Sequence, residues 1–265
     1  MNKEMFMTDK FVDTNIVFDS IYSARPLHSN FYSSLSTEFF LRQLNITEST
    51  RIETHRIAMC SAGYLSLELY NSIRPLDWDN LKADEKESVL KKINKNLGVD
   101  EGIRNKGLTI FVIEALKVIT PNLLNLSKSE IILTLCPHLS YHYTRALQLD
   151  IAEHFDQPPV DRGHDKYNSL ITTLKDANDN CKAFKLNENQ DFDILSDLVL
   201  LIRVGARYSN TKTKEFGLIK FYSRDKKFKD NFNEFKVYLD NKVKNEEEIQ
   251  ILDALGKIEM NKPYG

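Results

Sequence analysis

Glycine and proline are scarce in this chain of 265 residues, which contains only 9 and 7 of them. These residues mark turns, so their scarcity predicts long elements joined by few turns, and therefore a helix-rich protein. The chain is long enough to bury a substantial core, which excludes the small stapled scaffolds. With 42% hydrophobic and 28% charged residues, the composition also excludes wholesale disorder and collagen-like repeats.

Cysteine is also rare, and Cys60, Cys136 and Cys181 stand too far apart to form a Cys-x-x-Cys metal knuckle. We expect buried thiols in a reducing compartment. No apolar run approaches the roughly 18 residues of a membrane span, and residues 1–10 lack an extended apolar signal region. The sequence therefore predicts a cytoplasmic protein with no membrane partner.

A large net charge is missing too, but the total of −2 hides an uneven distribution. Residues 203–244 contain 12 Lys or Arg and 5 Asp or Glu, whereas residues 1–202 contain 22 and 28. A basic face in the C-terminal third would attract phosphate backbones. A solvated surface of lysine-rich helices explains the same numbers, so the asymmetry alone leaves both interpretations open.

Two short apolar segments, 11–18 and 217–223, have the composition of buried strands. Asp13 interrupts the first segment, and Asp225 follows the second. Aspartate is rarely buried unless it is paired or bound to a metal. Each aspartate is therefore expected at the carboxyl end of its strand, where open α/β sheets place ligands.

Two further acids have a similar setting. A third strand is expected at 56–61, and the helix that follows it contains Glu68. Residues 191–208 predict a helix buried against a sheet, and this helix contains Asp197. Two other glutamates compete for the role of Glu68: Glu38 and Glu53.

The carboxyl ends of parallel strands lie on one edge of a sheet, so these acids are expected to converge there. Converging carboxylates repel one another, and the usual compensation is a hard divalent cation such as Mg²⁺ or Mn²⁺. Such a cation lowers the pKa of a bound water or clamps a phosphoryl group during displacement. The catalytic and metal-binding candidates are Asp13, Glu68, Asp197 and Asp225.

Each acid also has an ordinary structural explanation. Asp13 can satisfy a strand-end turn, Glu68 can lie on a solvated helix face, and Asp197 can cap a helix N-terminus. The sequence leaves these alternatives open.

Other residues are candidates for supporting roles. Asp193 lies four positions before Asp197, and the repulsion between two acids at this spacing would be relieved by a nearby cation. Asn15 and Ser223 are expected to orient carboxylates or water by hydrogen bonds. The candidates for binding a phosphate backbone are Arg224, Lys226 and Lys227.

Four motifs, taken in order, resemble those of PIN-domain ribonucleases. Phe-Val-Asp-Thr-Asn at 11–15 resembles the opening strand of that family, and Ser61 followed by Glu68 resembles its second-strand serine and helix glutamate. Residues 196–202 resemble a helix that begins with aspartate and runs apolar, and residues 221–228 resemble a late strand ending in Ser-Arg-Asp-x-x-Phe.

This resemblance implies an α/β fold, a Rossmann-like three-layer α/β/α sandwich around a mostly parallel sheet. The PIN-like nuclease core would comprise 1–75 and 183–245, with a helix-rich insertion at 76–182 and a helical C-terminal tail at 246–265. Ordinary family members lack so long an insertion.

The resemblance also implies an Mg²⁺- or Mn²⁺-dependent endoribonuclease, acting as a toxin or a phage-defence effector. The expected partners are RNA, an inhibitory antitoxin or defence-complex protein, and a second copy of the chain. Two alternatives stay open: a catalytically inactive PIN-like scaffold that binds RNA or a protein, and a helical interaction protein in which the acids never converge.

Overall fold

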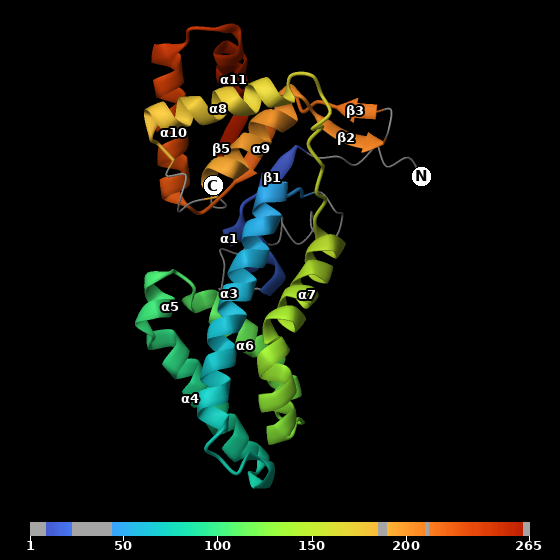
Figure 1. Cartoon of the computed structure of the whole chain (residues 1–265), viewed down its shortest axis with the longest axis vertical. Coiled ribbons are helices and arrows are strands. Elements are labelled where there is room, and N and C mark those ends of the chain that lie inside the picture. Colours follow the sequence, from blue (N-terminus) through green and yellow to red (C-terminus); the bar gives the residue numbers. More distant parts are fainter. Residues whose placement is uncertain (1–8, 23–43, 185–189, 210–211, 262–265) are drawn as a thin grey trace. The chain divides into compact units, whose positions relative to one another are not determined.

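A computed structural model describes residues 9–22, 44–184, 190–209 and 212–261 (Figure 1). The chain divides into two compact units. Unit 1 comprises Met1–Ser20, Pro26–Glu53 and Ala152–Gly265, and unit 2 comprises Ile21–Arg25 and Thr54–Ile151.

Unit 1 combines a small sheet with helices. Its strands are β1 (Lys10–Val12), β2 (Ala206–Ser209), β3 (Lys212–Lys214), β4 (Ile219–Tyr222) and β5 (Ile258–Asn261). Its helices are α8 (Tyr167–Cys181), α9 (Asp191–Arg203), α10 (Lys226–Lys242), α11 (Glu246–Gly256) and most of α1 (Thr14–Tyr22). The first turns of α3 (Glu48–Ile73) and the end of α7 (Cys136–His154) belong to it as well.

The main sheet is parallel, with β4 between β1 and β5. Two single parallel bridges extend it beyond β1, from Phe11 to Asn45 and from Asn45 to Asp156. The pairing order across the sheet is thus Asp156, Asn45, β1, β4, β5. Strands β2 and β3 form a separate antiparallel hairpin. The expected α/β class with a parallel sheet is confirmed.

The core of unit 1 forms where the sheet meets α8 to α11, which pack against one another (Figure 1). Phe11 and Phe221 are fully buried and belong to the same cluster as the apolar residues of α9. In α10, the buried residues Phe228, Phe232 and Phe235 recur at the spacing of one helix face. Phe11 of β1 and Phe221 of β4 therefore share one core with α9 and α10.

Unit 2 is helical. It contains the rest of α3, the 3₁₀-helix η2 (Trp78–Asn80), α4 (Ala83–Val99), α5 (Glu101–Asn105), α6 (Thr109–Leu123), the π-helix η3 (Glu130–Leu135) and most of α7. Trp78 is fully buried, and its indole N–H donates to the Leu126 carbonyl at 3.0 Å. Among the described helices, none combines the length and apolar character required to cross a membrane.

Several expectations need correction. Residues 56–61 are not a strand but part of α3, and the thiol of Cys60 is exposed rather than buried. The helical unit begins earlier than 76 and ends before 182, because α8 contributes Leu170 and Leu174 to the core of unit 1. The tail at 246–265 is not wholly helical, since β5 adds a parallel strand to the sheet.

Candidate active site

The ends of β1 and β4 lie side by side because their register places Val12 opposite Tyr222. The Asp13 N–H donates to the Tyr222 carbonyl at 3.0 Å, so the next residues along, Asp13 and Ser223, are neighbours. The Ser223 hydroxyl donates to Asp13 Oδ2 at 2.6 Å. The structure thus brings together two predicted residues that are 210 positions apart in the chain.

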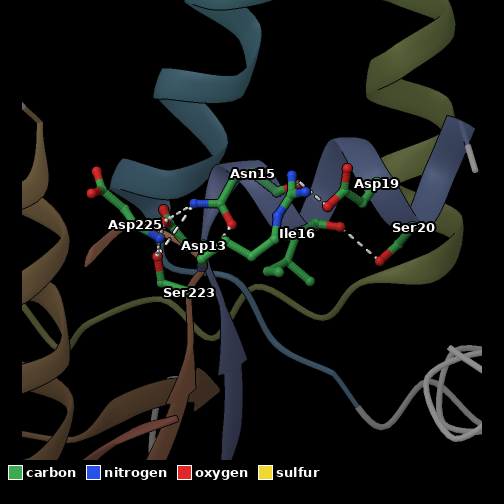
Figure 2. A network of polar contacts seen from close by, with 8 residues as sticks. Asp13, Asn15, Ile16, Asp19, Ser20, Ser223 and Asp225 are labelled. Carbon is green, nitrogen blue, oxygen red and sulfur yellow. Dashed lines mark hydrogen bonds and ion pairs between the residues drawn. The ribbon is translucent and has the colours of Figure 1, made fainter. Parts of the chain in front are cut away.

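Asp13 accepts two further hydrogen bonds from its own segment. The Thr14 N–H donates to Oδ1 at 2.7 Å, and the Asn15 side-chain amide donates to Oδ2 at 2.6 Å. The same Asn15 amide lies 3.3 Å from the Ser223 hydroxyl. Figure 2 shows Asp13, Asn15 and Ser223 pointing toward one another, so the orienting role predicted for Asn15 and Ser223 matches their contacts.

The Asp13 carboxylate is buried, with only 5% of the residue exposed. Burial raises its pKa to about 7, while the hydrogen bonds from Ser223 and Thr14 act in the opposite direction. Repulsion from Glu53 and Asp225 also contributes to this raised pKa. Negative charge is therefore concentrated at this edge of the sheet.

Glu53 is the acid that α3 contributes to this edge. Its Oε2 accepts a hydrogen bond from the Thr14 hydroxyl at 2.7 Å. The sequence indicates Glu53 only as an alternative to Glu68, and the other alternative, Glu38, lies outside the described residues. A signal for Glu53 existed in the sequence, because Thr50, Thr54 and Ala58 repeat at the spacing of a buried helix face.

Glu68 lies in unit 2, fifteen residues beyond Glu53 on the same helix. Its carboxylate accepts hydrogen bonds from Asn96 at 2.8 Å and Ser72 at 3.2 Å. The expected convergence of Glu68 with Asp13 rested on a strand at 56–61. Because that segment is helical, α3 places Glu53 at the site instead.

Asp225 follows the end of β4 by three residues. Its N–H donates to the Ser223 hydroxyl at 2.9 Å. Its Oδ1 accepts from the backbone N–H groups of Lys227 at 2.7 Å and Phe228 at 3.3 Å, so Asp225 caps α10. Asp225 therefore caps α10 and also lies close enough to Asp13 to repel its carboxylate.

Arg224 has a different setting from the one predicted. Its guanidinium pairs with the buried Asp19 at 2.5 Å and donates to the Asn15 carbonyl at 3.3 Å. The Arg224 N–H donates to Asn15 Oδ1 at 3.2 Å. Arg224 therefore ties the turn after β4 to α1 and is only partly exposed, whereas the neighbouring Lys226 and Lys227 are exposed.

Asp197 projects from α9 toward the start of α3. Its Oδ2 accepts a hydrogen bond from the Ser49 N–H at 2.9 Å. Desolvation raises its pKa to about 6, and repulsion from Glu48 and Asp193 adds to this effect. The repulsion predicted between Asp193 and Asp197 is thus present in α9, and burial also raises the pKa of Asp193.

The donors near Asp13 are carboxylate oxygens, the kind that Mg²⁺ and Mn²⁺ prefer. Within the described ranges, however, no three His, Cys, Asp or Glu side chains form a group that could hold a metal ion. Magnesium is commonly held by only one or two carboxylates and completes its coordination with water and substrate phosphate. The acids at this edge, Asp13 and Asp225 with Glu53 nearby, would suit only a site of that open kind and not a closed four-acid cage.

Comparisons with family models, with curated proteins and with solved structures find no match to this chain.

Proposed function

We propose that this protein is a metal-dependent endoribonuclease with a PIN-like, Rossmann-type core. The observation that carries the proposal is the pairing order of the parallel sheet. Numbered along the chain, the segments at 10–12, 45, 156, 219–222 and 258–261 lie in the order 3-2-1-4-5. In doubly wound sheets, ligands bind where this order reverses, which here is between β1 and β4, beside Asp13 and Ser223.

The charges of the site support a phosphate substrate and a cation. Asp13 and Asp225 would hold Mg²⁺ or Mn²⁺, with Glu53 as a third acid. Such an ion supplies an activated water and neutralises charge on a phosphodiester. Asn15 and Ser223 keep the Asp13 carboxylate in one orientation, because they fix the same oxygen from two sides. Lys226 and Lys227 follow directly and supply positive charge for the RNA backbone.

Cleavage of labelled RNA tests the proposal. The purified protein should cut single-stranded or structured RNA in Mg²⁺ or Mn²⁺ and lose this activity in chelator. Asp13→Asn should remove it, whereas Asp240→Asn, which changes an exposed acid on α10, should cut like the parent. Full activity in chelator, or in Asp13→Asn, would refute the metal mechanism.

One observation favours a second candidate, a PIN-like scaffold that binds RNA without cutting it. Asp13 already accepts three hydrogen bonds, and no group of three acids is assembled among the described residues. In this case RNA binding would persist in chelator with no products. In both cases the double variant Lys226→Ala/Lys227→Ala should bind RNA with a weaker dependence on salt. The slope of the logarithm of the binding constant against the logarithm of the salt concentration should fall by roughly 0.7 for each phosphate contact that is lost. An unchanged slope in the double variant would mean that RNA binds at another part of the surface.

A further inference from the structure

The first turn of α3 receives hydrogen-bond acceptors from two places. The first backbone N–H groups of any helix lack partners within the helix. In α3, the Thr50 N–H donates to the Thr47 hydroxyl at 3.0 Å, which is a local cap. The Ser49 N–H instead donates to Asp197 of α9, 148 positions away in the chain. A distant carboxylate thus completes this helix end.

The contact has a favourable electrostatic direction. A carboxylate at a helix N-terminus is stabilised by the exposed N–H groups and the helix dipole. Glu48, in the same turn, repels Asp197. Arg162 forms an ion pair with Glu48, which offsets part of that negative charge. The arrangement is therefore an anchor for the start of α3.

The anchored helix carries Glu53, the acid that α3 contributes to the candidate site. Glu53 is four residues after Ser49, one helical turn further along α3. Its carboxylate accepts from the Thr14 hydroxyl, and the Thr14 N–H donates to Asp13. A continuous series of contacts thus leads from Asp197 through α3 and Thr14 to Asp13, all within unit 1.

We infer that Asp197 is a positioning residue that fixes the first turn of α3, and with it Glu53, and that it is not a ligand of the cation. This inference rests on the proposed nuclease function. In this role Asp197 acts by accepting a hydrogen bond from the Ser49 N–H, and the neutral side-chain amide of asparagine can accept the same bond. A metal ligand needs the negative charge, which an amide cannot replace.

Three variants separate these roles. Asp197→Ala removes the acceptor, and cleavage should fall about tenfold, the value of a lost hydrogen bond to a charged group. Asp197→Asn keeps an acceptor for the Ser49 N–H and should stay within about threefold of the parent, because asparagine and aspartate are equally good caps. Asn178→Ala is the structural control: Asn178 bonds both the N–H and the carbonyl of Phe184, away from α3. It should lower the melting temperature without slowing the folded enzyme.

Two further measurements make the outcome independent of folding yield. Hydrogen exchange at Ser49–Arg51 should speed up in Asp197→Ala but not in Asp197→Asn or Asn178→Ala. Mn²⁺ affinity, measured by paramagnetic resonance, should be nearly the same in Asp197→Asn and the parent. An Asp197→Asn variant that loses both Mn²⁺ affinity and cleavage as Asp13→Asn does would overturn the inference and make Asp197 a ligand.

The two proposals fail in distinguishable ways. If the parent protein cuts no RNA with either metal, the nuclease function is refuted, and hydrogen exchange alone decides the positioning role. Unchanged exchange at the start of α3 in Asp197→Ala would then refute the positioning role as well. If the parent cuts RNA and Asp197→Ala cuts equally well, only the positioning role is refuted.

Discussion

The two units bury acidic groups very differently. Among the described residues, unit 2 buries a single acid, Glu114, which pairs with Lys117 of the same helix at 2.5 Å. Unit 1 buries four aspartates: Asp13, Asp19, Asp161 and Asp191. Burying a carboxylate is costly, and folds retain such costs mainly where function requires them. Two of the four, Asp13 and Asp19, bond to the turn that follows β4, which is the edge where we propose the site.

The largest expected effect concerns the dependence of stability on pH. The pKa of Asp13 rises from 3.8 to about 7 on folding, so between these values the unfolded chain releases a proton that the folded chain keeps. The free energy of unfolding should therefore fall as pH rises from about 4 to 7, by up to about 4 kcal/mol. Asp197, with its pKa raised to about 6, adds to the same slope.

Denaturant titrations of the metal-free protein across this range measure the slope. Asp13→Asn should flatten it, and Asp240→Asn should not. An Asp13→Asn variant with the parent's slope would mean that Asp13 is ionised in the fold without penalty, and the contrast between the two units would lose its main support.

A matched pair of variants compares the basic partners of buried acids. Arg224→Ala leaves Asp19 buried without its ion pair and should cost about 3 kcal/mol. Lys117→Ala removes the partner of Glu114, but Lys117 is mostly exposed, so the cost should be below about 1 kcal/mol. Equal losses in thermal or denaturant unfolding would show that the two units tolerate buried acids alike.

A second pair lies on one helix that belongs to both units. Glu53→Gln should slow RNA cleavage on the order of 100-fold, about 2.7 kcal/mol, because Glu53 lies beside Asp13. Glu68→Gln should change the rate little, since Glu68 bonds to Asn96 and Ser72 in unit 2. Initial rates on one labelled RNA measure both. The reverse result would restore Glu68 as the site acid.

The smallest effect separates charge from capping at Asp225. Asp225→Asn keeps an acceptor for the Lys227 and Phe228 N–H groups and should leave stability within a few tenths of a kcal/mol. Asp225→Ala should cost about 1 kcal/mol. Both should lose metal-dependent cleavage if Asp225 is a ligand. Melting curves and cleavage assays on the same samples distinguish a cap alone from a cap that also binds metal.

The sequence predicted the strand-end parts of the site better than the helical part. Apolar runs located β1, β4, Asp13 and Ser223, because strand ends in a parallel sheet share an edge, although residues 14–18 of the first run form α1 and not a strand. The sequence failed at α3, where the buried face consists of small or polar residues such as Thr50, Thr54 and Ala58. Counting large apolar residues misses such a face, and the apolar patch at 56–61 then resembles a strand.

Two other features depend on tertiary contacts that no local pattern encodes. Strand β5 is short and buries only Ile258, so its residues read as the end of a polar helix until pairing with β4 is known. The ion pair of Arg224 with Asp19 joins residues more than two hundred positions apart, and the basic composition of 203–244 predicts only exposed charge there.

The pairing of β1 with β4 also governs when the site can exist. Asp13 is synthesised before Ser223, which follows 210 residues later, and the intervening chain must close a long loop before the two strands meet. A nascent chain released before β4 therefore carries Asp13 without its partner strand and cannot assemble the site. The arrangement around Asp13 therefore forms only after β4 has been synthesised and paired with β1, well after Asp13 itself.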